Sequence, residues 1–461
     1  TADPGALWAH AFEEAGRWIR HDFWTADMSG VDWDEALSMY RPLLPRVATS
    51  AEFADLLWEL QGELGTSHAY VYPSGSFGGQ SRVRGESAAL LGADVSRAPD
   101  GRWLVDRVLP GESSDPRARS PLAAPGVAVR PGDEITEVNG RPVDSLHGPW
   151  PLLAGTAGKP VELTIVAAAP NLVPDLPPKE TELPDTAKDT TKDTTGRAGV
   201  PATDPTAPGP ADTAAPGRNS RRVVVVPLSD DRRLRYQDWV AGRRQFVRER
   251  SGGRIGYLHV PDMMGEGWAH LHRDLRTEMG RDALIIDVRG NRGGHTSQLI
   301  VEKLARRVIG WDTARWIRPV SYPEDAPRGP VVALADESSG SDGDIVTAAI
   351  RTLGLGPVIG TRTWGGVIGI DGGHGLVDGT RISVPKYSFW FTSYGWGVEN
   401  YGVDPDEEVL ITPDDWAAGR DTQLETAVDR ALALLEEHPP ARPPDPSTGP
   451  AKRRPPLPPR S

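Results

Sequence analysis

The chain has 461 residues, enough for about three domains, and its 38% hydrophobic and 25% charged residues are typical of a globular protein. A formal net charge of -13 argues against nucleic-acid binding, and no apolar run of about 18 residues exists to span a membrane. The absence of Cys excludes disulfides, Cys-ligated metals and Cys nucleophiles.

Residues 1–82 are predicted to be helical. The N-terminus lacks a basic-then-apolar signal segment. The chain also opens without Met, so we expect a fragment or a processed product. Apolar residues at helical spacing predict a helix that opens near Ser50 and ends at Gly65, before a short strand. His68 then lies at a helix-to-strand junction, where it can face a cleft. The alternative is a half-buried structural His.

Residues 83–230 are predicted to form a second, β-rich unit. Residues 103–108 and 161–166 have the pattern of strands, and Asn139-Gly140 predicts a hairpin turn. Residues 169–220 are rich in Pro, Thr, Asp and Ala and almost lack large apolar residues, so we expect a disordered insertion. The strand that resumes at residues 221–228 is expected to pair with 161–166 across this expanded loop.

The stretch GVAVRPGDEITEVNGRPV in this unit resembles the central part of PDZ domains. Such domains bind an extended peptide by adding it to a sheet edge. Leu91-Gly92-Ala93 matches the loop whose amides receive a terminal carboxylate in that family. The alternative is a PDZ fold that only packs between its neighbours.

Residues 231–437 are predicted to form an α/β layer with partly parallel strands. The apolar runs 283–288 and 331–335 each lead through a polar, Gly-containing turn into a helix. The Pro-rich, basic tail 438–461 is expected to be disordered.

Ser341 stands where the second of these turns meets its helix. A serine there exposes its hydroxyl beside the free N–H groups of the first helical turn, so that a nucleophile and half of an oxyanion hole can share one turn. The alternative is that Ser341 or Asp342 simply caps the helix.

The Gly293-Gly294 pair follows a strand and precedes a helix, which lets backbone amides approach an anion. A tight turn or a nucleotide phosphate site would also fit, although the pattern is neither G-x-G-x-x-G nor a P-loop. An oxyanion hole would need only two donors, the amide of Gly294 and the amide that follows Ser341.

A serine nucleophile needs a base. The sequence has no Lys between Ser341 and Lys386, which disfavours a Ser-Lys pair from the helix after the nucleophile. Of the histidines, His68 is preferred because it lies in a short polar break. Its second ring nitrogen needs an orienting group; Ser67 is adjacent and Glu399 lies in a polar loop, and spacing leaves both open.

From about residue 5 to 438 the chain resembles the catalytic half of the tricorn protease family, serine peptidases distantly related to the carboxy-terminal processing proteases. The matching motifs, in order, are GELGTSHAYV, the PDZ-like stretch, RIGYLHVPDM, LIIDVRGNRGG, ESSGSDGD, RTWGGVIGI and GVENYGVDPD. This resemblance implies that Ser341 is the nucleophile and His68 the base. Ser67 and Glu399 would complete a tetrad that orients the imidazole.

The same resemblance implies that the amides of Gly294 and Asp342 form the oxyanion hole. Asp312 matches the acidic residue that favours a basic side chain before the scissile bond. In that family this residue reaches the pocket from a neighbouring subunit of a hexamer. Read alone, Asp312 would be an ordinary helix cap or surface residue.

The main departure from the family is the absence of the two β-propeller domains that precede its catalytic half. We expect either the C-terminal part of a longer protein or a shortened relative. The expected function is that of a cytosolic serine endopeptidase that cleaves oligopeptides, including those released by a larger protease, through an acyl-enzyme and without metal or cofactor. The alternatives are a catalytically silent PDZ-containing peptide-binding scaffold and an extracytoplasmic Ser-Lys processing protease.

Overall fold

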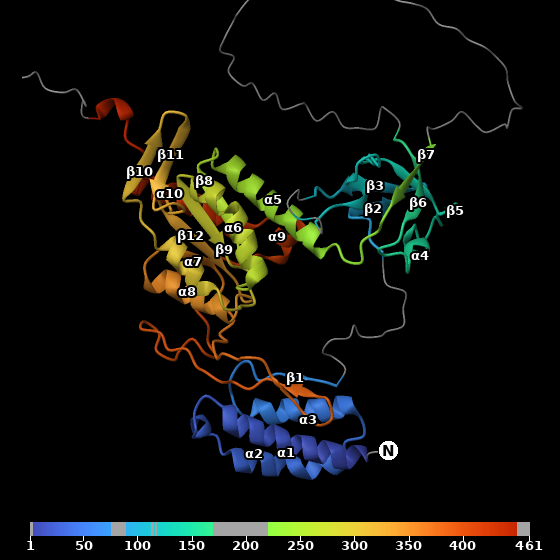
Figure 1. Ribbon diagram of the computed structural model, residues 1–461, viewed down its shortest axis with the longest axis vertical. Helices are drawn as coiled ribbons and strands as arrows, with labels where there is room; N and C mark the ends of the chain where they lie inside the picture. The colour runs from blue at the N-terminus through green and yellow to red at the C-terminus, as the bar shows by residue number, and fades with distance from the viewer. Residues whose placement is uncertain (1–2, 75–88, 112–114, 116–117, 169–219, 450–461) are drawn as a thin grey trace, which may run out of the picture. The chain divides into compact units, whose positions relative to one another are not determined.

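The computed structural model describes residues 3–74, 89–111, 115, 118–168 and 220–449. The chain divides into two compact units, Arg84–Trp239 on the one hand and Thr1–Val83 with Val240–Ser461 on the other. The predicted fold class is confirmed: a helical N-terminal part, a β unit and an α/β part follow one another (Figure 1). The predicted disordered insertion lies outside the described residues apart from Ser220.

The α/β part is built on a five-stranded sheet with the order β16-β13-β12-β9-β8, in which every neighbouring pair is parallel. Its strands are β8 (Ile255–His259), β9 (Ala283–Asp287), β12 (Val331–Ala335), β13 (Val358–Gly360) and β16 (Glu407–Glu408). Strands β9 and β12 are buried at every position. Uninterrupted apolar runs of this kind are expected of parallel strands that are covered on both faces.

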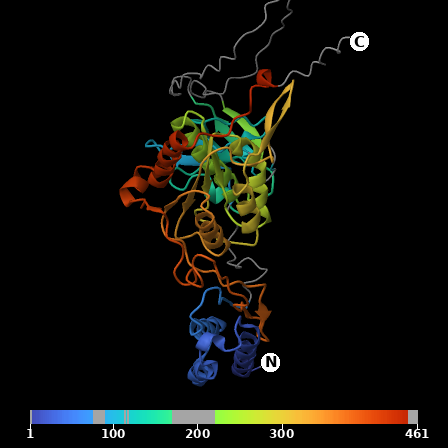
Figure 2. The ribbon, with the colours of Figure 1, turned by 90° about the vertical axis from the view of Figure 1, so that its left-hand side faces the viewer.

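Helices cover both faces of this sheet. One group of three helices shares a single hydrophobic core with the strands: α6 (Gly265–Met279), α7 (Ser297–Leu304) and α8 (Asp342–Thr352). Helix α10 (Thr422–Glu437) contacts the same strands from the opposite side, where Figure 2 shows it in red. The buried stripe of α10, from Leu424 to Leu435, supplies the second core.

Because these strands are parallel, the loops at their carboxyl ends gather at one edge of the sheet. Strand β9 leads into residues 288–296, β12 into 336–341 and β13 into 361–368. The order of the strands therefore brings the Gly293-Gly294 turn and the Ser341 turn side by side, with a third loop next to them.

A buried ion-pair network fixes the exit of β9 toward its loop. Asp287 is fully buried, accepts a 2.8 Å hydrogen bond from the Tyr257 hydroxyl and pairs with Arg289 at 2.7 Å. Arg289 also pairs at 2.8 Å with Asp421, the N-cap of α10. Breaking such a buried pair leaves an uncompensated charge, so the loop start is held firmly.

The helical N-terminal part consists of α1 (Pro4–Asp22), α2 (Trp33–Tyr40) and α3 (Ser50–Gly62). Side chains set their ends: Asp32 caps α2, and Thr49 and Glu52 form a capping box at α3. The helices enclose a core that includes Phe12, Ile19, Phe53, Leu57 and Leu60.

A small antiparallel sheet joins this helical part to the later chain. Strand β1 (Val71–Tyr72) pairs with β15 (Arg381–Ile382), which pairs with β14 (His374–Gly375). The Ser383 hydroxyl adds a 2.6 Å hydrogen bond to the carbonyl of His68. Residues near position 70 are thus held beside residues near position 382, although more than 300 positions separate them in sequence.

The unit Arg84–Trp239 contains an antiparallel sheet with the order β2-β3-β4-β6-β7, and β5 pairs with β4. The strands are β2 (Ala93–Arg97), β3 (Trp103–Val108), β4 (Glu134–Val138), β5 (Arg141–Pro142), β6 (Val161–Val166) and β7 (Ser220–Val225). The predicted Asn139-Gly140 turn joins β4 to β5, and β6 pairs with β7 as expected from the sequence. Helix α5 (Arg232–Arg250) leads out of this unit.

Two features differ from expectation. A hairpin of β10 (Gly310–Ala314) and β11 (Ile317–Tyr322) was not predicted, because its residues are largely exposed and give no apolar alternation. The tail was expected to be disordered from residue 438, but its first residues are held by the main chain: the Ala441 amide donates to the Arg328 carbonyl at 2.7 Å. Arg442 also pairs with Asp282 at 3.2 Å.

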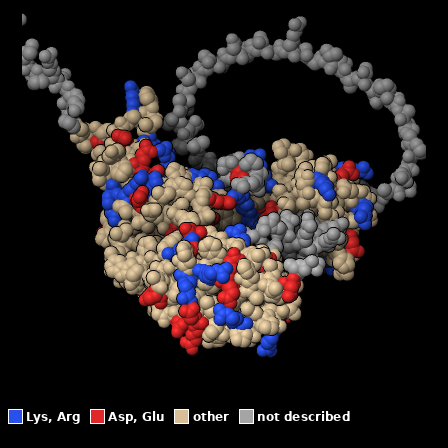
Figure 3. All heavy atoms as spheres, turned by 60° about the horizontal axis from the view of Figure 1, so that its bottom comes forward, with Lys and Arg blue, Asp and Glu red and all other residues tan. Residues whose placement is uncertain are grey.

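On the face presented in Figure 3, the acidic and basic side chains of the described residues are interspersed rather than gathered by sign. Within the described ranges, no helix is long and apolar enough to cross a bilayer.

Candidate active site

Ser341 occupies the strained junction between β12 and α8. Its backbone has φ 57° and ψ -119°, a conformation that residues other than glycine rarely adopt. Its amide donates a 2.8 Å hydrogen bond to the Asp344 carboxylate in the first turn of α8. A strained turn between a strand and a helix is typical of a serine whose hydroxyl is presented to a substrate.

The two glycines predicted to approach an anion lie against this turn. A Cβ at Gly293 would come within 2.5 Å of the Ser341 Cβ and 3.0 Å of the Asp342 amide nitrogen, so the backbone can approach only because residue 293 is glycine. A Cβ at Gly294 would meet the Met263 carbonyl oxygen at 2.0 Å, and this residue has φ +149°.

The amide of Asp342 belongs to the first residue of α8, where helix geometry leaves N–H groups without an intrahelical acceptor. Its carboxylate accepts a 3.1 Å hydrogen bond from the Ser297 amide at the start of α7, and burial raises the pKa of this carboxyl group. The Asp342 side chain thus ties the Gly294 loop to the nucleophile turn. Its main chain remains available to an oxyanion.

Asn291 strengthens the same junction from inside. This fully buried side chain donates to the Val260 carbonyl and accepts from the Gly293 amide, both at 2.8 Å. Its own carbonyl accepts from the Gly340 amide at 2.8 Å. One residue therefore fixes the glycine turn and the residue before Ser341 together.

His68 follows α3 and has the left-handed φ of 61°. Its ring nitrogen Nδ1 lies 2.8 Å from the Ser67 hydroxyl oxygen. The imidazole is buried, and this burial lowers its pKa although the Glu399 carboxylate acts in the opposite direction. The ring is therefore held neutral near pH 7, the state that a general base requires.

Glu399 receives hydrogen bonds from both sides of the site. Its Oε1 accepts from the Ser67 amide at 2.7 Å and from the Thr66 hydroxyl at 3.0 Å. Its Oε2 accepts from the Ser67 hydroxyl at 3.2 Å and from the amides of Val367 and Ile368 at 2.7 and 3.0 Å.

These contacts fix the tautomer of His68. When the Ser67 hydroxyl donates its hydrogen bond to Glu399, its oxygen accepts a hydrogen bond from the Nδ1–H of His68. Nε2 is then the unprotonated nitrogen, free to accept a proton from a nucleophile. Both residues that the sequence left open therefore lie in series behind the imidazole, Ser67 in contact with Nδ1 and Glu399 in contact with Ser67.

Two hollows meet at this imidazole. One has a volume of about 580 Å³ and is lined by His68, Ser341, Gly293 and Gly294, with Tyr70 and Tyr387 among its walls. The other, of about 280 Å³, is lined by His68, Tyr70, Arg292, Glu337 and Trp364. The structure thus brings the predicted nucleophile, base and glycine turn to one concave surface.

Lys386 belongs to a different cluster. Its ammonium group lies 3.0 Å from Asp22 and 3.0 Å from Asp371, and hydrogen bonds to these two carboxylates raise its pKa. A cation held in this way is a poor base, so the geometry does not favour the Ser-Lys alternative.

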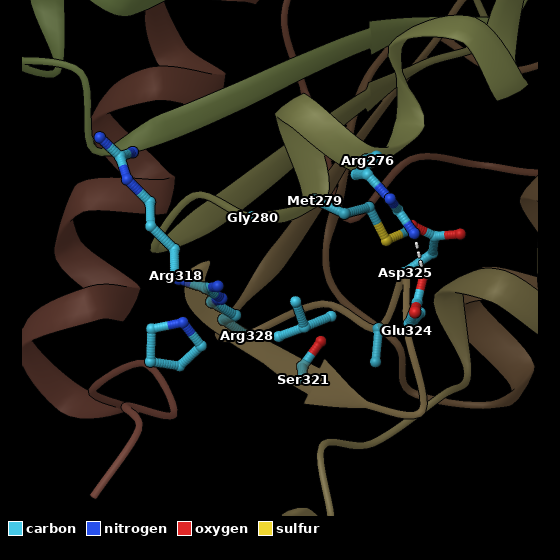
Figure 4. A pocket seen from close by; sticks show the side chains of 11 residues that line it. Arg276, Met279, Gly280, Arg318, Ser321, Glu324, Asp325 and Arg328 are labelled. Atoms are coloured by element: carbon cyan, nitrogen blue, oxygen red, sulfur yellow. Dashed lines mark hydrogen bonds and ion pairs between the residues drawn. The ribbon is translucent and has the colours of Figure 1, made fainter. Parts of the chain in front are cut away.

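Asp312 is not brought to the hollows around Ser341. It lies on β10 with an exposed side chain, and the hairpin continues through Trp316, which is 84% exposed. Beside β11 lies a separate hollow of about 330 Å³, where Arg276 pairs with Glu324 and where Arg318 and Arg328 also lie (Figure 4). Within one chain, the carboxylates that line these two hollows with His68 are Asp262 in the larger and Glu337 in the smaller, not Asp312.

Three residues of the site were not predicted from the sequence: Thr66, Asn291 and Asp344. All three lie in motifs that were noted for their neighbours: GELGTSHAYV contains Thr66, LIIDVRGNRGG contains Asn291 and ESSGSDGD contains Asp344. Among the described residues, no group of three or more His, Asp or Glu side chains could hold a metal ion.

Three separate parts of the chain match known family models. Residues 4–62 match the tricorn protease C1 domain, residues 89–171 the tricorn protease PDZ domain and residues 254–409 peptidase family S41.

Relatives align with almost the whole chain. "Tricorn protease homolog 1" of Streptomyces coelicolor is 56% identical over 96% of this chain and 37% of its own length. A "Putative Tricorn-like protease C-terminal subunit" of Sulfurisphaera tokodaii is 35% identical over 94% of this chain and 44% of its own length. A crystal structure of the tricorn protease superposes with a TM-score of 0.78 and 31% identity, over 95% of this chain and 37% of that one. The chain spans less than half the length of these relatives, and it belongs to the tricorn protease family.

Proposed function

We propose that the chain is the catalytic part of a serine endopeptidase that hydrolyses oligopeptides through an acyl-enzyme. The observation that carries this proposal is the series from Glu399 through Ser67 to His68, which ends at a hollow that Ser341 also lines. A silent peptide-binding scaffold would have no need of a buried imidazole with a fixed tautomer beside a strained serine.

In the proposed reaction, Nε2 of His68 takes the proton of the Ser341 hydroxyl as its oxygen attacks the scissile carbonyl. The amides of Gly294 and Asp342 stabilise the oxyanion, each without reorganising at the moment of reaction. The imidazolium is stabilised through Ser67 by the Glu399 carboxylate and gives its proton to the leaving amine. A water molecule, activated by the same His68, then releases the acyl group.

Substitution separates the serine–histidine mechanism from the Ser-Lys alternative. Ser341→Ala is expected to remove the nucleophile and to lower kcat on oligopeptides by at least about 10⁴-fold. Lys386→Ala is expected to leave kcat within a few-fold, because its ammonium is bound to Asp22 and Asp371. Steady-state hydrolysis of a fluorogenic peptide measures both, and an inactive Lys386→Ala beside an active Ser341→Ala would refute the assignment.

The pH profile tests the role of Glu399. His68 must be neutral to act as a base, and burial lowers its pKa, so kcat/KM should fall only as the pH drops below the ordinary histidine value of about 6.5. Glu399→Gln removes the charge that raises this pKa. We expect its acidic limb to move to still lower pH while the maximal rate falls, because the imidazolium loses its support. A profile with an unmoved acidic limb would contradict this role.

We also propose a preference for Lys or Arg before the scissile bond, supplied by Asp312 of a neighbouring copy in a homo-oligomer. Support comes from the hairpin itself. Asp312 is exposed and does not line the hollows around Ser341 of its own chain, and Ile309, Trp316 and Ile317 near it are exposed too. A carboxylate that pairs with a basic side chain selects it by charge. The hexameric state, the cytosolic location and the supply of oligopeptides by a larger protease remain predictions from the family resemblance.

A mixing experiment tests this donation between subunits. Asp312→Asn should lower kcat/KM for Arg-containing peptides by roughly 10- to 100-fold, the worth of a charged hydrogen bond, and Ser341→Ala should be inactive. Mixed and reassembled, the two should regain Arg-specific cleavage, because one copy keeps the nucleophile and the other supplies Asp312.

Glu337→Gln is the matched control, since Glu337 lines the smaller hollow together with His68 in the same chain. If the Arg preference is lost in Glu337→Gln but kept in Asp312→Asn, the selecting carboxylate is Glu337. Failure of the mixture to exceed Asp312→Asn alone would argue against donation between subunits.

A further inference from the structure

The carboxylate of Asp344 accepts four hydrogen bonds beside the nucleophile. It is fully buried in the first turn of α8, three residues after Ser341. Oδ2 accepts from the amides of Ser341 and Gly366, at 2.8 and 3.1 Å. Oδ1 accepts from the Gly365 amide at 2.8 Å and from the Thr363 hydroxyl.

This arrangement exceeds what a helix cap needs. In a capping box, the side chain at this third helical position accepts the amide of the N-cap residue, which here is Ser341. The other donors all belong to residues 363–366, in the loop that follows β13. Burying a carboxylate is costly unless its oxygens are fully hydrogen-bonded, so the group is placed to join two segments rather than to stabilise one helix.

The same loop continues to the other half of the site. The amides of Val367 and Ile368 donate to Oε2 of Glu399, the oxygen that also accepts from the Ser67 hydroxyl. Residues 363–368 are therefore hydrogen-bonded at both ends. The first end binds Asp344, which also accepts from the Ser341 amide, and the second binds Glu399, which also accepts from the Ser67 hydroxyl.

Trp364, within this loop, contacts both the Ser341 turn and the imidazole of His68. Its amide donates to the Ser339 carbonyl at 3.1 Å, just before the nucleophile. Its ring stands edge-on to the His68 imidazole, with 5.4 Å between the ring centroids. A Cβ at Gly340 would come within 2.7 Å of this ring, so the contact with the nucleophile turn is close.

We propose that Asp344 is a positioning residue that sets Ser341 at its working distance from His68, by binding residues 363–366 to the nucleophile turn while Glu399 binds residues 367–368 to the base. The inference rests on the proposed peptidase function, which it deepens. It assigns to the loop 363–368 the task of joining the two halves of a site whose main residues lie far apart in sequence.

The test is a pair of substitutions at the edge of this network. Thr363→Val removes one of the four donors to Asp344 and also the acceptor of the Val403 amide, and Thr363→Ser retains both. Asp344→Asn is the stronger change, since its amide group turns a donor toward other donors. A misplacement of reacting groups by about 1 Å costs on the order of 10²-fold. We expect kcat to fall by about that factor in Asp344→Asn and several-fold in Thr363→Val, with KM within twofold and with recovery in Thr363→Ser.

Thr347→Val is the matched control. Thr347 is buried on the same helix and donates a 2.8 Å hydrogen bond to the Gly343 carbonyl, outside the 363–368 loop. It should lower the unfolding temperature as Thr363→Val does, yet leave kcat within twofold. If both variants lower kcat alike, or if Thr363→Val changes KM instead, Asp344 is a structural residue only.

A second readout does not require turnover. The titration of His68, followed by NMR of its ring, reports the nearby Glu399 charge, which raises the imidazole pKa. Loosening the loop in Thr363→Val should lower this pKa, and Thr347→Val should leave it unchanged. A shifted titration in a chain without peptidase activity would support the positioning role and overturn the proposed function. If the chain is active and neither its kcat nor the titration of His68 changes in Thr363→Val, the positioning role alone is overturned.

Discussion

The geometry of the site depends on the hydrogen bonds that the Glu399 carboxylate accepts. This carboxylate accepts from Thr66 and Ser67, at the end of the helical N-terminal part, and from Val367 and Ile368, in a loop of the α/β part. Without it, the ring of His68 would lose both the group that fixes its tautomer and the link to the chain that carries Ser341. Hydrogen bonds to an ionised acceptor are about twice as strong as neutral ones, which suits a contact between segments so far apart in sequence.

The parallel sheet supplies the other half of the geometry. Because β9, β12 and β13 are neighbours, their carboxyl-end loops bring together Gly293-Gly294, Ser341 and residues 363–368. Close approach then requires glycine at 293 and 294, since a Cβ at either would collide with the Ser341 turn or the Met263 carbonyl. The strain at Ser341 is sustained by buried polar groups on both sides, Asn291 and Asp344.

Much of this could be predicted from local pattern. A buried apolar run, a polar turn and a helix placed Ser341 at an exposed junction, and a glycine after α3 placed His68 at another. The contact between Ser67 and Glu399 could not be predicted from their spacing in the sequence. The two residues are 332 positions apart, and only the folded chain brings their side chains to 3.2 Å. Asp344 was hidden for a related reason: three of its four donors come from residues about 20 positions away. The β10–β11 hairpin was missed because its exposed strands carry no period-2 apolar signal.

The most direct test is covalent labelling with a peptide chloromethyl ketone that ends in Arg, followed by mass mapping of the modified peptide. Such a reagent is captured by the serine and alkylates the catalytic histidine. We expect a single adduct on His68 that disappears in Ser341→Ala. An adduct on another histidine, or one on His68 that persists in Ser341→Ala, would contradict the assignment of nucleophile and base.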